Sequence, residues 1–105
     1  MFNIDNNNIK SEGAKLLATQ LTTNYGLSKL YCDSNDIGEE GAEEIAVCME
    51  MMDSLKKICM ENNAIKDRGV IALAHALEEN DTLLSLYLEN NSITAAGAKE
   101  VGKIL

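Results

Sequence analysis

The chain contains no proline and no tryptophan, and only one histidine and one phenylalanine among its 105 residues. Without proline, no helix or strand is interrupted from within. Because aromatic residues make up only 4% of the chain, a core has to be built from Leu, Ile, Val, Ala and Met. No apolar run approaches the roughly 20 residues of a membrane-spanning helix, and no charged-then-apolar leader opens the chain. We therefore expect one globular domain without a membrane partner.

Positive charge is also scarce, with nine Lys and Arg against 17 Asp and Glu, which gives a net charge of −8 at pH 7. Nucleic acid and anionic membranes require a basic surface, so we expect neither as a partner, and a partner protein should have a basic contact surface. Cys32, Cys48 and Cys59 are odd in number and lack disulfide or metal spacing. Reduced thiols of this kind favour a cytoplasmic location.

What the chain does contain is one unit repeated with a period of 28 residues. The shift superimposes three sets of positions: Leu27, Leu55 and Leu83; Asn35, Asn63 and Asn91; Gly41, Gly69 and Gly97. One further step back reaches Asn7 and Gly13 in an incomplete first unit. A fixed period of this length indicates a solenoid. We expect a single domain whose repeats cover residues 1–26, 27–54, 55–82 and 83–105.

The third unit shows what each repeat should form. Ile58 and Met60 are two apart, which is the period of a strand with one buried face. Gly69 should open a helix that Asn80 closes in a left-handed conformation. The side chains that should point inward are Ile58, Met60, Ile65, Leu73 and Leu77. Because stacked strands lie about 4.8 Å apart and helices need about twice that, the stack should bend, with strands on the concave face and helices on the convex face.

The runs Leu27–Ile37 and Leu83–Ile93 resemble the leucine-rich repeat signature. The unit length, with Gly-Ala pairs at 13–14, 41–42 and 97–98, is similar to the ribonuclease-inhibitor subclass. The resemblance implies an α/β solenoid in a short right-handed arc, and a non-enzymatic module that binds a protein and regulates an enzyme by covering its working site. The asparagine-rich chain also resembles small leucine-rich effectors of intracellular bacterial pathogens, which would act in the host cytosol. A repeat segment of a larger receptor or scaffold is the alternative.

Three columns of polar or aromatic residues should line the concave face. One column should combine tyrosines with Cys59, the second should carry a carboxylate in every unit, and lysines should lie at the margin. The candidate partner-binding residues are Tyr31, Asp33, Cys59, Glu61, Tyr87, Glu89, Lys29, Lys57 and Asp5. Tyrosine is favoured at binding hot spots, so we interpret this stripe as the site for a basic partner. A solvated polar face is the simpler alternative.

The turns that follow the strands should extend that contact, because four short strands supply little of the roughly 800 Å² per partner that a stable interface buries. The turn residues concerned are Asn6, Ser34, Asp36, Asn62, Asn90 and Ser92. The asparagine column Asn7, Asn35, Asn63 and Asn91 should instead be structural, with each amide bonded to its own turn and to the next one.

Metal binding and catalysis find little support in the sequence. Asp33, Asn35, Gly38 and Glu44 have EF-hand spacing, but Ile37 occupies a ligand position and the repeat explains each residue, so we expect no metal or cofactor. His75, the single histidine, should lie on the convex side, opposite Cys59. That separation excludes a nucleophile–base pair.

The ends of the stack and its second helix allow more than one interpretation. Apolar residues should be exposed at both ends, which allows self-association: Phe2, Ile4 and Ile9 at one, Leu88, Ile93, Val101 and Leu105 at the other. In the second helix Met51 should be exposed and Met49 buried, so loose methionine packing and a small convex contact patch are both open.

Overall fold

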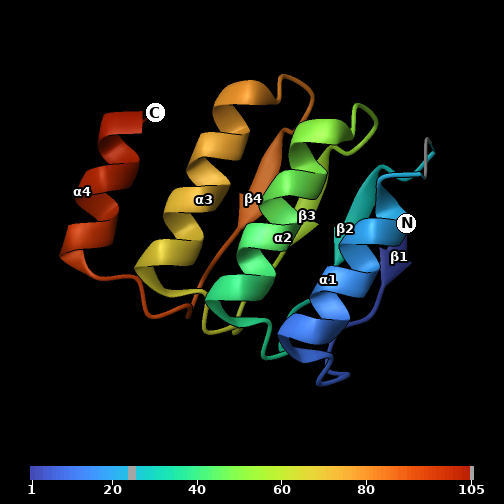
Figure 1. Cartoon of the computed structure of the whole chain (residues 1–105), viewed down its shortest axis with the longest axis horizontal. Helices are drawn as coiled ribbons and strands as arrows, with labels where there is room; N and C mark the ends of the chain where they lie inside the picture. Colours follow the sequence, from blue (N-terminus) through green and yellow to red (C-terminus); the bar gives the residue numbers. More distant parts are fainter. Residues whose placement is uncertain (24–25, 105) are drawn as a thin grey trace.

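The computed structural model describes residues 1–23 and 26–104, in which four short strands alternate with four helices (Figure 1). The strands form one parallel sheet in the order β1-β2-β3-β4, and the helices lie side by side over one of its faces. The elements are β1 (Phe2–Asn3), α1 (Lys10–Leu21), β2 (Lys29–Tyr31), α2 (Gly38–Met51), β3 (Lys57–Cys59), α3 (Lys66–Glu79), β4 (Ser85–Tyr87) and α4 (Ala95–Ile104). The expected α/β solenoid is confirmed.

The 28-residue period is also the register of the sheet. Leu30 pairs with Ile58, and Ile58 pairs with Leu86. At the first edge, Phe2 pairs with Leu30. Equivalent residues of successive repeats therefore stand next to each other, so every column in the sequence becomes a row across the sheet.

The core lies between the sheet and the helices. Ile58, Met60, Ile65 and Leu73 are fully buried, as the sequence predicts, and Leu77 is half-buried. A single unit leaves one side of its apolar layer uncovered, and the neighbouring unit covers it. Stability in such a stack therefore depends on the contacts between units as much as on the units themselves.

The asparagine column satisfies the buried backbone of the turns. The Asn63 amide nitrogen donates to the carbonyl oxygens of Cys32 and Glu61 at 3.0 Å, and its Oδ1 accepts from the backbone N–H of Asn35 at 2.9 Å and of Ile37 at 3.3 Å. The structural interpretation is confirmed. The expected bond to the own turn is found. The second expected bond has the wrong direction, because the amides of Asn35, Asn63 and Asn91 reach back to the preceding turn and not forward to the next.

The turn backbone itself adopts left-handed conformations at regular places. One such position per repeat is occupied by Asn6, Ser34, Asn62 and Asn90, with φ between 57° and 62°. A second, two residues later, is occupied by Asn8, Asp36, Ala64 and Ser92. Asn, Asp and Ser tolerate this region because their short polar side chains bond locally, which explains the polar character of the turns.

The repeated glycines do not open the helices, as the sequence suggested. Gly41 and Gly69 lie three residues inside α2 and α3. A Cβ atom on Gly69 would lie 3.0 Å from the Cβ of Ala42 in the neighbouring helix, and one on Gly41 would lie 3.1 Å from that of Ala14. The atom nearest to either added Cβ would be Cγ2 of the isoleucine just before the same helix, Ile37 or Ile65, so the glycines make room for that side chain as well as for the neighbouring helix. Asn80 also differs from expectation, since it ends α3 in an extended conformation (φ −110°, ψ 120°).

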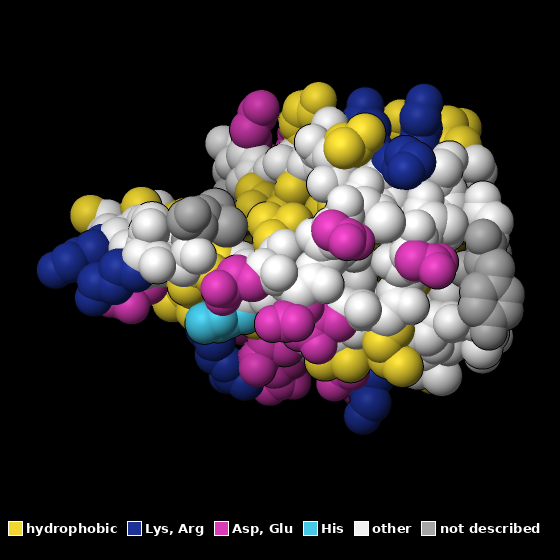
Figure 2. All heavy atoms as spheres, turned by 90° about the horizontal axis from the view of Figure 1, so that it is seen from above, with side chains coloured by type: hydrophobic (Ala, Val, Ile, Leu, Met, Phe, Trp, Pro, Cys, Tyr) yellow, Lys and Arg dark blue, Asp and Glu magenta, His cyan; other side chains and the backbone are white. Residues whose placement is uncertain are grey.

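The fourth helix is packed less closely than the others. A cavity of about 220 Å³ lies between α3, α4 and the sheet, lined by Val70, Leu73, Ala74, Leu77, Leu86, Leu88 and Val101. Figure 2 shows hydrophobic side chains in a recess beside the protruding C-terminal helix. Alanine and glycine account for half of α4, so it projects few large side chains toward α3.

The expected exposure at the ends is found for two large side chains. Phe2 is 42% exposed at the first edge and Ile93 is 37% exposed at the other, whereas Ile4, Ile9, Leu88 and Val101 are half-buried. Leu105, for which exposure was also expected, lies outside the described residues.

The asparagine bonds predict a large effect of Asn63→Ala on stability. The substitution leaves two buried N–H groups without an acceptor, each at a cost of about 1–3 kcal/mol, so the free energy of unfolding should fall by about 3 kcal/mol or more. Asn7→Ala is the matched control, because the amide of Asn7 makes its bonds at the exposed end of the same column. Urea unfolding measures both, and equal midpoints for the two variants would contradict the structural role.

Candidate functional site

The face of the sheet that the helices leave open carries a tyrosine on each side of the central strand. Tyr31 on β2 and Tyr87 on β4 both pair in register with Cys59 on β3. Lys57, two residues before Cys59, extends along the same face, and its Nζ lies 5.3 Å from the centre of the Tyr31 ring and 5.1 Å from that of Tyr87. The structure therefore brings Tyr31, Lys57, Cys59 and Tyr87 together as the sequence suggested, but Lys57 lies over the tyrosines and not at the margin.

Cys59 does not contribute the accessible side chain that its column predicted. Cys59 is only 7% exposed, because its short side chain lies on the sheet surface between the two longer tyrosines and is covered by Lys57. Burial is the main cause that raises the pKa of this thiol, and the charge of Asp33 raises it further. Cys59 therefore forms the buried base of the candidate site, and its thiol is a poor nucleophile.

The carboxylate column runs just beyond the strand ends, with one side chain in each unit. Asp5 and Asp33 accept a hydrogen bond from the backbone N–H of the next unit: Asp5 Oδ1 from Asp33 at 2.7 Å and Asp33 Oδ1 from Glu61 at 2.8 Å. The longer Glu61 and Glu89 stand in the same column, half-buried and exposed respectively. The two aspartates therefore join adjacent units, and Glu89 is the member of the column whose side chain is exposed.

Partial burial and the like charges of this column both act on Glu61. Partial desolvation, followed by the negative charges of Glu89, Asp33 and Asp5, raises the pKa of Glu61 above its usual value. Like charges on adjacent strands destabilise a sheet slightly. A cation bound beside the column would relieve that repulsion.

The remaining predicted residues surround this centre. Lys29 is exposed on β2 opposite Lys57 in the register. Basic side chains gather on the sheet side in Figure 2, which views all the repeats from the side where their strands begin. Five turn residues are exposed and Ser34 is half-buried, the exposed ones being Asn6, Asp36, Asn62, Asn90 and Ser92. The outer sheet face thus changes from basic at the strand starts to acidic beyond the strand ends.

A family model described as "Leucine Rich repeat" matches residues 2–18, 54–74 and 79–102, together more than half of the chain. The chain belongs to the leucine-rich repeat family. Among solved structures, "Leiomodin-1 Actin-Binding Site 2 (ABS2)" is similar to it with a TM-score of 0.89 at 21% sequence identity, over 97% of this chain and 61% of that chain. At this identity the likeness concerns the fold. The comparison with curated proteins gives no match.

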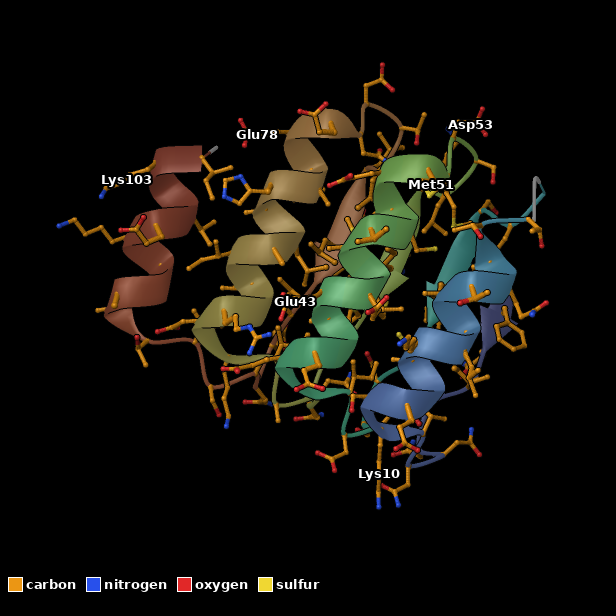
Figure 3. The ribbon with its side chains drawn as sticks, viewed as in Figure 1. Lys10, Glu43, Met51, Asp53, Glu78 and Lys103 are labelled. Carbon is orange, nitrogen blue, oxygen red and sulfur yellow. The ribbon has the colours of Figure 1, made fainter. Side chains whose placement is uncertain are left out.

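The convex side of this leucine-rich repeat chain carries the residues that the sequence placed there. His75 is exposed on α3, with Nδ1 3.2 Å from Glu78 Oε1. Met51, at the C-terminal end of α2 (Figure 3), is 67% exposed, and Met49 is buried. His75 and Cys59 thus belong to opposite layers of the repeat, with helix and sheet between them.

The helix side is also held by an ion pair between units. Glu43 on α2 lies toward α3 (Figure 3), and its Oε1 is 2.6 Å from Arg68 Nη2. Both side chains are more than one-third exposed, so the pair adds little to stability. The ion pair connects the facing sides of α2 and α3 and is not part of the candidate site.

The EF-hand spacing noted in the sequence does not assemble in this repeat protein. Asn35 is buried, and its amide donates to the carbonyl oxygens of Ile4 and Asp33. Over residues 1–23 and 26–104, no group of three His, Cys, Asp or Glu is placed to hold a metal ion. No helix in the same part of the chain has the length and hydrophobicity that crossing a membrane takes.

Burial of Cys59 between the two tyrosines predicts its reactivity. Tyr87→Ala removes one wall without changing the charge, so alkylation of Cys59 by iodoacetamide should become several-fold faster, while Cys32, which is 0% exposed, should be unaffected. Peptide mass spectrometry of a time course measures both thiols. Leu84→Ala, at an exposed residue of the same repeat, is the control, and an unchanged Cys59 rate in Tyr87→Ala would contradict this arrangement.

Proposed function

We propose that this chain is a non-enzymatic module that binds one protein partner through the outer face of its sheet. The proposal depends mainly on one observation: Lys57 lies over the rings of Tyr31 and Tyr87, and Glu61 and Glu89 follow on the same face. Proteins of this family commonly bind partners, and a concave repeat surface offers an extended contact area. Tyrosines supply stiff, amphipathic contact area at little entropic cost.

The chemistry of the face supports a basic partner surface. The chain carries a net charge of −8, and the carboxylate column includes the half-buried Glu61 and the exposed Glu89. Opposite charge on the partner would speed association and favour correct orientation. Lys29 and Lys57, at the beginning of β2 and β3, would add selectivity. They would favour a basic partner that also places acidic groups against the beginning of these strands.

The repeat geometry supports a finer assignment. The 28-residue register and the helix of 12 to 14 residues in each of the first three units support assignment to the ribonuclease-inhibitor-like subclass, which we include in the proposal. We include in the proposal a single domain of four repeats, regulation of an enzyme by covering its working site, and a cytoplasmic location, which for an effector would be the host cytosol. The similar leiomodin-1 structure is named as an actin-binding site, so actin is one partner to test directly.

Substitution of the central residues tests the proposal. In Tyr31→Ala/Glu61→Ala/Tyr87→Ala, loss of two aromatic anchors and one carboxylate should weaken partner binding by about a hundredfold or more, since a hot-spot residue contributes about 2 kcal/mol or more. The wild-type chain and the triple variant are used to capture proteins from a lysate with quantitative mass spectrometry. Purified actin and each protein retained only by the wild type are then titrated to obtain Kd.

A convex variant controls for general damage. Val47→Ala/His75→Ala/Glu78→Ala alters the same number of exposed residues on the helices, and its affinity should stay within about threefold of the wild type, as expected for residues outside the interface. Urea midpoints confirm that all proteins are folded. A partner that binds Tyr31→Ala/Glu61→Ala/Tyr87→Ala with normal affinity, but binds the convex variant more weakly, would overturn the proposal.

A repeat segment of a larger receptor or scaffold is the second candidate, favoured by the exposed Phe2 and Ile93 at the two edges. An uncovered repeat edge promotes association, so this candidate predicts that the isolated chain oligomerises. Sedimentation velocity over a range of concentrations measures this. A monomer with a single cooperative unfolding transition would count against it and against self-association through the ends.

A further inference from the structure

The ammonium group of Lys57 lies between two aromatic rings of its own chain. Its Nζ is 5.3 Å from the centre of the Tyr31 ring and 5.1 Å from that of the Tyr87 ring. Both distances are within the about 6 Å over which a cation is attracted to the face of an aromatic ring. A positive charge therefore already occupies the middle of the candidate binding face.

The slot that holds this charge is a product of the sheet register. Tyr31 and Tyr87 stand on the strands flanking β3, about two strand spacings or ~9.6 Å apart. The residue between them is Cys59, whose small side chain is buried beneath. A large residue at this position would fill the space, so the sequence Tyr, Cys, Tyr across three strands leaves room for one cation.

The surroundings of the slot also favour a cation. Asp33, Glu61 and Glu89 each follow two residues after a member of the row Tyr31, Cys59 and Tyr87, and so lie on the same face. Desolvation and the negative charges of its neighbours raise the pKa of Glu61. The pKa of Lys57 is raised as well, first by the interaction of its ammonium group with the Tyr31 side chain.

Lys57 is held there weakly enough to be replaced. Its side chain is long and half-buried, and it makes its two ring contacts at the surface, where each cation–π contact is modest. No carboxylate among the described residues forms an ion pair with it. A Lys or Arg on a partner segment could make the same two ring contacts and, through neighbouring basic residues, also meet the glutamates that Lys57 does not pair with.

We propose that the slot between Tyr31 and Tyr87 receives a lysine or arginine side chain of a basic partner segment, and that Lys57 is an internal stand-in that leaves when this side chain enters. The inference rests on the proposed function and specifies the recognition site within it. Lys57 then acts as a specificity residue. It keeps the rings covered against isolated cations and lets in a segment whose further basic groups bind the carboxylates.

The test uses a short peptide of alternating lysine and serine as the probe, with a peptide of alternating glutamate and serine as its control, in buffer of about 150 mM salt. Ring currents should shift the ε-methylene protons of Lys57 upfield in the unbound chain. On titration they should move to the position of an exposed lysine while the ring protons of Tyr31 and Tyr87 shift. Binding of the lysine peptide with unchanged Lys57 resonances would overturn the proposal, and so would absence of binding.

Matched variants separate the slot from general charge. Lys57→Ala should bind the lysine peptide about five- to thirtyfold more tightly, because two exposed cation–π contacts no longer compete with the peptide. Most of this gain should be lost in Lys57→Ala/Tyr31→Leu, which lacks one of the two rings. Lys56→Ala removes the same charge from the exposed residue next to Lys57. It should change the affinity by less than about twofold, because both ring contacts of Lys57 stay in place and salt screens an exposed surface charge. Equal effects of Lys57→Ala and Lys56→Ala would overturn the proposal.

Failure of the slot and failure of the proposed function give different results. A captured partner that needs Tyr31, Glu61 and Tyr87 but leaves the Lys57 resonances in place supports the binding face and overturns the slot. Displacement of Lys57 by the peptide, together with a captured partner that binds the triple variant normally, supports the slot as a cation site and overturns the proposed function.

Discussion

The whole stack depends on satisfying the polar backbone of its turns. Each turn leaves the sheet edge and enters the interior, where an unpaired N–H or C=O is costly. Asn35, Asn63 and Asn91 avoid this cost. The side-chain amide of each donates a hydrogen bond to a backbone carbonyl oxygen of the preceding unit. Because the bonds cross from unit to unit, they also fix the register, and the register places every other side chain of the sheet.

The candidate site is a consequence of that register. Residues on the buried side of the strands are constrained by packing, as Leu30 and Ile58 show with 0% exposure. Residues on the outer side have no such constraint, and so they are free to differ between units. Tyr31, Cys59 and Tyr87 occupy one row, and their differences in size create a space between two rings that none of the three residues defines alone.

Periodicity made most of the fold predictable. The spacing of Ile58, Met60 and Leu73 was enough to assign strand, helix and interior, because these are intervals within one chain segment. It was not enough for contacts whose direction is set in three dimensions. A strict repeat looks the same forward and backward, so the sequence could not show that Asn63 binds the preceding turn. Nor could it show that glycines 41 and 69 lie inside their helices, where they make room for the isoleucine before each helix and for the neighbouring helix.

The site itself was predictable as a set of residues but not as an arrangement. Alternation along a strand says that Cys59 faces outward, and it does, yet outward does not mean exposed when longer neighbours lean over it. Lys57 covers the row Tyr31, Cys59 and Tyr87 because its four-carbon side chain extends along the strand toward these residues. Residue spacing alone does not predict this. The bare alternation would have described a flat polar face. A small residue between two large ones, with a long cation just before it, makes that face a site with a charge preference of its own.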